Sequence, residues 1–565
     1  MTQGGGAVAE PAAPPFAFRS WEAISRAWDR APVREPWRVL GPLLVVQWLA
    51  LGLFTLSVHH NGWLFYQGGD QIWYLASSWL LGHGSITVPR VSYGWPLVLL
   101  PFSWIWGGSY LRGLPATVLL QVLVLGPIAL YCMYDIGARI GGRVVGYVSA
   151  AAWTIGPYLV IPLFVQRYHE KYVDQFLPHP LGLTAMADYP ALVLLLVAAA
   201  LGMRAVQSRD PATALVAGLA AGLSIGMKPS NLIWPPAVAV LLLLTRRWRE
   251  TLAFGIGLLP ALGALALWKY RGFGYVPAFQ SSYEEMRLAA GSDSLLHPYH
   301  HYVHINWHQL HINQLQLAEF FFSVRVLEVA PIVGAIAVAR RSWPAAAFLS
   351  VWFWSYVVLK GSSDNASVED GSFFRFLLPA APALLLMLAA LPVLVPRVGP
   401  RLADRFHAPP PGKLSKRTVI VAAIALGLVP LAAAGAVRPL KGPEDLIQVR
   451  RVATPVDGGV DLQAAVKGRT VLLKWRAEAA AGTSVFYRLA RARGRTDVAC
   501  DIRPGAADEC LADVRAVRTQ RSTSAVDRPG PGTWTYRVGV GTNYLNDPAQ
   551  GDIFLVSRPV TVTVR

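Results

Sequence analysis

Residues 68–82 read GGDQIWYLASSWLLG and lie just beyond the first long apolar run of the chain. They place a single carboxylate, Asp70, at this point, and the apolar and aromatic side chains behind it recur every three to four residues. This spacing predicts a helix that lies flat at the headgroup level of a membrane, with its acid turned toward lipid-borne molecules. The alternative is that Asp70 only caps this helix, because Asp is a favoured N-cap residue.

The composition of this chain indicates whether it folds in water or in a membrane. Hydrophobic residues make up 54% of its 565 residues and charged residues only 15%, which is too apolar for a soluble globular protein. The net charge of +18 suggests a nucleic acid partner at first sight, but much of the Arg and Lys lies in short loops between apolar runs. That arrangement is the orientation signal of membrane insertion. We therefore expect a polytopic α-helical membrane protein whose partner is the lipid bilayer and not a nucleic acid.

About eleven apolar runs have the length that a bilayer requires. A further segment, 94–110, is interrupted by Pro96 and Pro101, and we expect it to lie in the interface. With this choice five basic loops fall on one side, which the positive-inside rule makes the cytoplasmic side. The expected spans are residues 39–58, 114–136, 144–165, 188–206, 213–228, 229–245, 251–270, 321–339, 345–360, 374–396 and 418–437.

This topology divides the chain into three parts. Residues 1–37 show no cleavable signal pattern and are expected to form a cytoplasmic tail, residues 38–440 the membrane domain, and residues 445–565 an extracytoplasmic domain. We expect a multi-pass protein of the cell (plasma) membrane that works at its outer face. The expected outer loops are 59–113, 166–187, 271–320 and 361–373.

Residues 445–565 are rich in short β-type segments separated by Pro/Gly turns such as 527–532. The pattern predicts an antiparallel all-β sandwich. Its strand spacing and the early Trp475 resemble a fibronectin type III-like module. Cys500 and Cys510 both lie here, and an oxidising exterior favours a disulfide between them over two free thiols.

Charged residues at the outer ends of apolar runs are costly unless they are paired or used. Asp188 opens one run and either belongs to a site or caps a helix whose first turn holds Pro190. Lys228 lies at a break between two runs and either binds a phosphate or marks a helix end. Arg375 and Arg112 are outer-face arginines, against the positive-inside trend. Two arginines and a lysine beside two acids describe a site for a phosphate whose partner must be deprotonated.

A series of short motifs accompanies these residues along positions 38–395. After the acid and interfacial helix that follow the first span come Gly94-Trp95-Pro96-Leu97, Gly107-Gly108, Arg112-Gly113-Leu114-Pro115, Gly222-Leu223, Lys228-Pro229 and Arg375-Phe376-Leu377-Leu378-Pro379. Their order resembles the GT-C membrane glycosyltransferases, in particular the protein O-mannosyltransferase and aminoarabinose transferase branch. The resemblance implies a GT-C fold and transfer of a hexosyl or pentosyl group.

In that family the donor is a sugar on a polyprenyl phosphate or diphosphate. The resemblance implies Asp70 as the catalytic base and Asp188 as the second acid, with Lys228 and Arg375 holding the lipid phosphate and Arg112 also binding substrate. The acceptor would be a lipid, a glycan or a protein, and direct displacement would invert the anomeric configuration. The chain departs from many relatives because Gly69 and Gln71 flank Asp70 where they have paired acids, and because Arg90 is the nearest cation to the place of a usual lysine.

Histidines gather in the loop 271–320, at spacings of three and four that would share one helical face. Such a face either binds a divalent metal or contacts sugars and phosphates, and interfacial imidazoles also occur without either role. His169 and Glu170 in the loop 166–187 give a similar hint of substrate contact, as does Asp174. The sequence names no certain cofactor, and a divalent metal stays open. The histidines are His297, His300, His301, His304, His308 and His311.

A multi-span transporter or flippase of a lipid-linked or anionic substrate is the competing class, because it also places ionisable residues near the membrane. Against it, the charges cluster at the outer face rather than at the midplane, and the sequence shows no inverted repeat by eye. A non-catalytic envelope scaffold would leave Asp70, Asp188 and Arg375 without a role. The sequence therefore favours the transferase.

Overall fold

The structure is a computed structural model of the chain, mostly helical up to residue 436 and β from residue 460 onward. The residues that it describes are 36–57, 70–82, 84–86, 91–106, 110–169, 177–273, 305–321, 324–363, 366–369, 372–395, 412–439, 460–477, 485–494, 515–520, 522–542 and 552–565.

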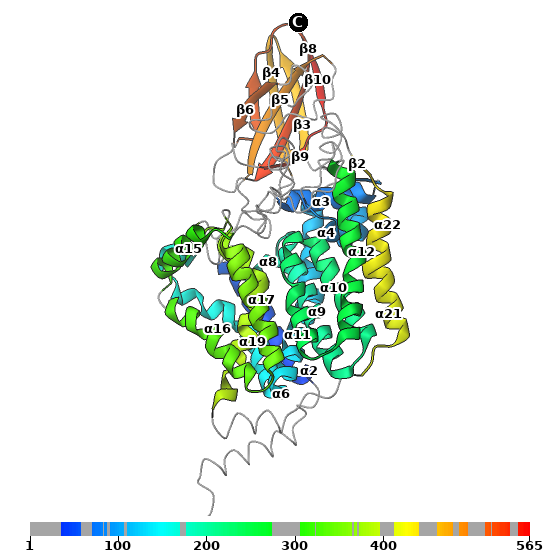
Figure 1. The fold of residues 1–565 in the computed structure, drawn as a ribbon. Coiled ribbons are helices and arrows are strands. Elements are labelled where there is room, and N and C mark those ends of the chain that lie inside the picture. The colour runs from blue at the N-terminus through cyan, green and yellow to red at the C-terminus, as the bar shows by residue number, and fades with distance from the viewer. Residues whose placement is uncertain are drawn as a thin grey trace, which may run out of the picture.

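The helical part is a bundle of long helices, with several short one-turn elements between them in the chain (Figure 1). Its first half consists of α2 (Trp37–Ser57), α3 (Asp70–Gly82), α4 (Gly94–Trp106), α5 (Tyr110–Leu119), η2 (Leu120–Leu125), α6 (Gly126–Leu159), η3 (Ile161–Leu163), η4 (Gln166–Tyr168), α8 (Pro178–Leu181), α9 (Asp188–Ser208), α10 (Pro211–Met227), η5 (Pro229–Ile233), α11 (Pro235–Leu244) and α12 (Trp248–Phe273). Its second half consists of α15 (Trp307–Phe320), α16 (Val324–Ala339), α17 (Trp343–Gly361), α18 (Ser372–Leu377), η6 (Leu378–Ala380), α19 (Ala381–Ala389), η7 (Leu391–Leu394), α21 (Lys416–Ala422), η8 (Ala423–Leu428) and α22 (Val429–Ala436).

Six helical stretches among the described residues are long and apolar enough to cross a membrane. Three shorter apolar helices, Pro211–Met227, Pro229–Leu244 and Val329–Ala339, accompany them. These findings agree with a membrane protein, and the count of about eleven spans stays a prediction. The six stretches are Trp37–Leu56, Leu114–Leu159, Asp188–Ser208, Trp248–Arg271, Ser372–Leu394 and Lys416–Ala436.

The stretch Leu114–Leu159 reverses direction in its middle. Its 46 residues would form a straight helix about 69 Å long, more than twice the hydrocarbon core of a bilayer. Instead, Gly141 and Gly142 leave helical geometry, and the Tyr134 and Tyr147 rings lie 4.8 Å apart. The sequence predicts two spans here, 114–136 and 144–165, and the structure differs from it in ending the second helix at Leu159.

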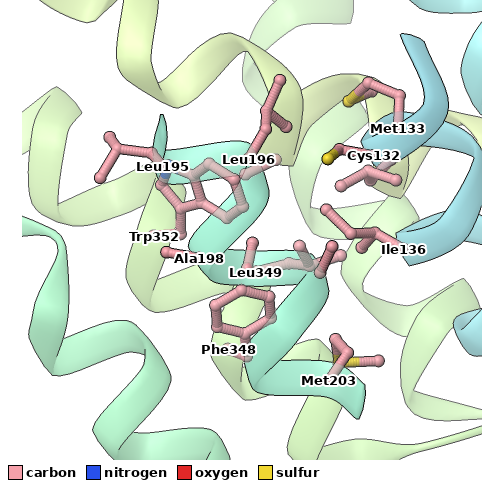
Figure 2. Packing of buried hydrophobic residues seen from close by; sticks show 14 of the residues in the cluster. Cys132, Met133, Ile136, Leu195, Leu196, Ala198, Met203, Phe348, Leu349 and Trp352 are labelled. Atoms are coloured by element: carbon pink, nitrogen blue, oxygen red, sulfur yellow. The ribbon is translucent and has the colours of Figure 1, made fainter. Parts of the chain in front are cut away.

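The interior of the bundle is built where α6, α9 and α17 meet. Cys132 and Met133 from α6 pack in one buried apolar cluster with Leu196 from α9 and Trp352 from α17 (Figure 2). The indole of Trp352 donates a 2.7 Å hydrogen bond to the carbonyl of Pro379, so its polar edge is satisfied inside this cluster. Packing of this kind holds the three helices in one arrangement.

Small residues allow α10 and α12 to approach closely. A Cβ on Gly218 would lie 2.2 Å from the carbonyl oxygen of Phe254, and one on Gly257 would lie 2.4 Å from that of Leu215. Neither glycine can therefore be enlarged without separating the two helices. This use of small residues at a helix interface is typical of membrane bundles.

The C-terminal part is a β structure of two antiparallel sheets. Trp475 is buried, as its sequence position predicts, and packs edge-on against Tyr487 of the other sheet at 5.7 Å. The two-sheet arrangement agrees with the predicted sandwich, while its likeness to fibronectin type III stays a prediction. One sheet has the order β3-β4-β7 and the other β10-β8-β5-β6 with β9 beside β8, and the strands are β3 (Val460–Lys467), β4 (Thr470–Ala477), β5 (Val485–Arg493), β6 (Arg515–Gln520), β7 (Ser524–Asp527), β8 (Gly532–Thr542), β9 (Asp552–Val556) and β10 (Val560–Val564).

The β structure lies at the end of the bundle that carries α3 and α4 (Figure 1). A short parallel pair joins the chain at this end, with β1 (Ser85–Ile86) beside β2 (Arg438–Pro439). Arg271 at the end of α12 reaches the same place, where its guanidinium donates a 2.5 Å hydrogen bond to the carbonyl of Val437. The helix ends described next belong to this end of the bundle.

Candidate functional site

The carboxylate of Asp188 binds two cations that come from distant parts of the chain. Lys228 forms an ion pair with it from 40 residues away, and Arg375 lies 3.4 Å from it across 187 residues. The N-cap residue of α9 is Ala187, and Asp188 is the first helical residue. The carboxylate of Asp188 thus binds side chains of other elements. We call Asp188, Lys228 and Arg375 the ionic cluster.

Local sequence explains how each member reaches this place. Lys228 ends α10 with extended backbone dihedral angles because Pro229 follows it, and residues before proline disfavour the helical region. Asp188 begins α9, and Arg375 lies in the short α18. All three therefore stand at helix ends, where side chains can meet between elements.

Charge and exposure are unequally distributed in the ionic cluster. The Asp188 side chain is 2% exposed, whereas those of Lys228 and Arg375 are 16% and 26% exposed. Two cations share one carboxylate, so the cluster carries a net charge of +1, and its reachable surface is the cationic side. An anion that approaches would meet an ammonium and a guanidinium, the two groups that proteins use to bind phosphate.

A buried hydrogen-bond network holds the helices around the ionic cluster. Asn231 of η5 donates to Ser224 of α10 at 2.8 Å, and Ser224 donates to the carbonyl of Ala191 in α9 at 2.8 Å. Tyr356 of α17 donates to the Asn231 side-chain oxygen at 2.9 Å. Asn231, Ser224 and Tyr356 are all fully buried. The network joins four elements, and two of its members, Ala191 and Asn231, lie three residues after Asp188 and Lys228, so it positions both ion-pair partners.

Lys360 is a cation of this region that the sequence does not single out. It lies in the last turn of α17, and its side chain is partly buried. The sequence offers only a weak signal, a lysine at the end of the predicted span 345–360. Lysines at such ends are common anchors, so their position alone does not indicate a site.

The start of α3 is tied to the segment that leads into α9. The side-chain oxygen of Gln71 accepts a 2.9 Å hydrogen bond from the Ala185 backbone N–H. The Trp95 indole donates to the Ala185 carbonyl, also at 2.9 Å. Asp70 is the first residue of α3, and its side chain lies outside the described part of the structure. Gln71, the residue after Asp70, is thus hydrogen-bonded to Ala185, which lies three residues before Asp188.

An open groove of about 260 Å³ lies beside this region. Arg167 and Glu319 form an ion pair in its wall, and Gln316 donates to Glu369 at 3.4 Å. Aromatic rings connect the groove with the ionic cluster, because the ring of Tyr168 contacts that of Phe374, the residue before Arg375. The groove is lined by Arg167, Tyr168, Gln316, Glu319, Phe320 and Glu369, which come from three of the predicted outer loops.

The remaining predicted residues are only partly covered by the structure. The Nε2 atom of His169 donates to the Phe164 carbonyl at 2.7 Å, so that nitrogen holds the protein backbone. Arg112 lies in α5, and its side chain is outside the described part, as are Glu170, Cys500 and Cys510 altogether. Of the histidine stripe, the structure describes His308 and His311 in α15.

Metal ligands do not gather in the described part of the chain. No group of three or more His, Cys, Asp or Glu side chains there is placed to hold a metal ion. Binding of a divalent metal therefore stays one of the alternatives that the sequence leaves open.

Comparison with known proteins gives limited similarity. No family model and no curated protein matches the sequence. Among solved structures, the chain is similar to an oligosaccharyltransferase of Archaeoglobus fulgidus in its apo form, at 15% identity and a TM-score of 0.41 over 75% of this chain. It is also similar to that enzyme in complex with Zn and sulfate, at 14% identity and a TM-score of 0.40 over 74% of this chain. The chain spans only 59% and 56% of the length of these two structures.

Proposed function

We propose that this protein is an integral membrane glycosyltransferase that transfers a sugar from a polyprenyl-phosphate-linked donor to an acceptor at the outer face of the membrane. The ionic cluster carries the proposal. Asp188 is buried and is contacted by two cations whose side chains are partly exposed. A lipid phosphate at the membrane surface is an anion that such a site suits.

The reaction needs one base and one anion site. The acceptor hydroxyl oxygen forms a bond to the anomeric carbon while the bond from that carbon to the phosphate oxygen breaks. The hydroxyl proton goes to Asp70, and the bonding electron pair leaves with the lipid phosphate, where Lys228 and Arg375 neutralise the growing charge. A single displacement of this kind inverts the anomeric configuration.

The position of the backbone at the start of α3 supports Asp70 as the base. Gln71 directly after it is hydrogen-bonded to Ala185, and Asp188 follows three residues later. The start of α3 thus lies against the segment that enters the ionic cluster. We propose Asp188 as an orienting acid rather than a base, because both of its oxygens already accept from cations.

The groove beside Arg375 is a candidate place for the acceptor. Carboxylates from Glu319 and Glu369 offer hydrogen-bond acceptors to hydroxyl groups, and the stacked rings of Tyr168 and Phe320 offer an apolar face. Sites that bind small molecules commonly combine an aromatic wall with a few polar groups in this way.

Sugar transfer with a panel of polyprenyl-phosphate sugars tests the proposal. Lys228→Ala and Arg375→Ala should each lower kcat/KM for the donor at least about tenfold, because each removes a charge-assisted contact. Arg340→Ala, which removes an exposed cation from a predicted cytoplasmic loop, is the matched control and should leave kcat/KM unchanged.

Two results would contradict the proposal. Folded wild-type protein that transfers no sugar from any donor of the panel would remove the transferase. Movement of a polyprenyl-phosphate sugar across sealed vesicles without transfer to an acceptor would favour the flippase instead.

A further inference from the structure

The helix α15 holds the segment 366–369, which precedes Arg375 in the chain. We propose that Asn313 of α15 is a positioning residue that sets Arg375 in place for phosphate binding. The inference rests on the proposed function, in which Arg375 holds the lipid phosphate. It extends that function to a helix that carries no member of the ionic cluster.

Asn313 is fully buried, and its side-chain amide bonds three backbone groups. The Nδ2 atom donates to the carbonyl of Gly361 at 2.9 Å and to that of Ala366 at 2.8 Å. The Oδ1 atom accepts from the Val368 backbone N–H at 3.2 Å. Gly361 is the last residue of α17, and the last carbonyls of a helix lack partners within it. An amide offers two donors and an acceptor, which is the set that these three groups require.

Two more amide side chains of α15 bind the same segment. Gln309 donates to the Ala366 carbonyl at 2.9 Å, and Gln316 accepts from the Glu369 backbone N–H at 3.3 Å. Gln309, Asn313 and Gln316 follow one another at spacings of four and three, so they share one face of the helix. This face of α15 therefore fixes the backbone of the segment.

The segment 366–369 is bonded in turn to the start of α18. The Ser367 N–H donates to the Ser372 hydroxyl at 3.0 Å, and the Phe373 N–H donates to the Ser367 carbonyl at 3.1 Å. Arg375 follows two residues after Phe373 in this helix of 6 residues. Because so short a helix has few internal bonds to stabilise it, the contacts at its start decide where its side chains lie.

The variant Asn313→Asp tests this role with almost no change in shape. A carboxylate keeps the acceptor but replaces both donors by an oxygen, which repels the two carbonyl oxygens that the amide bonds. The segment 366–369 must then move, and Arg375 with it. Protonation restores one donor, and burial raises the pKa of such a carboxyl group because its charged form loses hydration. The effect of Asn313→Asp should therefore fade as the pH falls.

Binding of methyl octyl phosphate to the purified full-length protein in detergent measures the effect. This phosphodiester keeps a single negative charge at both pH values of the experiment. At about pH 8, Asn313→Asp should bind it about tenfold more weakly than the wild type, because Arg375 no longer makes its charge-assisted contact. At about pH 6, the difference from the wild type should shrink to less than about threefold.

Asn306→Asp is the matched control, because it makes the same substitution in the same helix. Asn306 is the N-cap of α15, and its side-chain oxygen accepts from the Gln309 N–H at 3.0 Å. Asp caps a helix as well as Asn does, so this variant should bind methyl octyl phosphate like the wild type. A loss equal to that of Asn313→Asp would show that any charge added to α15 weakens binding, and would overturn the inference.

A double-mutant cycle with Arg375→Ala separates positioning from a general loosening of the fold. Arg375→Ala alone should weaken methyl octyl phosphate about tenfold. In that background Asn313→Asp should change the affinity less than about twofold, because the side chain that it positions is gone. Additive losses, or unchanged affinity in folded Asn313→Asp at about pH 8, would overturn the inference.

Gln309→Leu carries the same cycle where Asn313→Asp fails to fold. It removes one of the two donors to the Ala366 carbonyl and should weaken methyl octyl phosphate about threefold. That loss should disappear in the Arg375→Ala background, and a loss that persists there would overturn the inference.

Failure of this inference differs from failure of the proposed function. Unchanged affinity in Arg375→Ala would contradict the phosphate site of the proposed function, and the inference with it. A loss in Arg375→Ala without a loss in Asn313→Asp would keep the phosphate site and remove only the positioning role of Asn313.

Discussion

The carboxylate of Asp188 lies 3.4 Å from the guanidinium of Arg375, although 187 residues separate them in the chain. Asp188 is buried and also forms an ion pair with Lys228, so both cations contact the same carboxylate. This relationship turns three charges at separate helix ends into one site.

Asp188→Asn should destabilise the protein by about 3 kcal/mol, because it removes the buried carboxylate that both Lys228 and Arg375 contact. Thermal unfolding in detergent measures the loss as a lower Tm. Octyl phosphate should raise the Tm of the variant more than that of the wild type, since an added anion replaces the lost charge. Equal Tm values without ligand would show that Asp188 does not hold the cations together.

Asp70→Asn should leave the fold and the donor affinity unchanged and lower the rate of sugar transfer about 100- to 10,000-fold. The amide is similar in shape but cannot accept the acceptor proton. Single-turnover transfer measures the rate, and product analysis gives the anomeric configuration. A rate near that of the wild type, or a product with retained configuration, would remove Asp70 from the role of base.

Gly142→Ala should destabilise the protein by about 1–3 kcal/mol. Gly142 has φ 85° and ψ 173° at the reversal within α6, a conformation that residues with a Cβ rarely adopt. Gly435→Ala in α22 is the matched control, because a Cβ there meets nothing within 4 Å and alanine favours a helix. Thermal unfolding should therefore give a lower Tm for Gly142→Ala and a higher Tm for Gly435→Ala than for the wild type.

His179 should make stability depend on pH. Burial lowers the pKa of His179 from 6.5 to about 3. Between these two pH values, His179 is protonated in the unfolded chain but stays neutral in the folded chain. Stability therefore falls as the pH drops from 6.5, by about 3 kcal/mol at pH 4.5. His179→Phe should lose this part of the pH dependence, as measured by Tm at several pH values. A His179→Phe profile identical to that of the wild type would mean that the buried imidazole does not resist protonation.

Membrane topology is open to cysteine labelling. In a background without the native cysteines, Gly530→Cys in the β structure should react with a membrane-impermeant reagent on intact cells. Lys413→Cys, in the basic segment predicted to be cytoplasmic, should react only after permeabilisation. The reverse pattern would place the ionic cluster on the other side and contradict a reaction at the outer face.

Much of the architecture follows from local sequence. The apolar runs predict helices of membrane length, Lys228-Pro229 predicts the end of α10, and the segments around Trp475 predict strands. These features depend on neighbours within a few residues, because helix periodicity, proline and alternation act over one or two turns. Asp188, Lys228 and Arg375 could be nominated from the sequence for the same reason, as charges at the ends of apolar runs.

Tertiary structure alone decided which of these charges meet. Helices that begin at Asp188 and end at Lys228 can face one another in many rotations, and nothing local to Arg375 specifies its partner across 187 residues. The buried bonds from Tyr356 to Asn231 and from Ser224 to Ala191 select one rotation of α17, α10 and α9. Helix ends are encoded by adjacent residues, whereas the contacts between helices depend on the packing of the whole bundle.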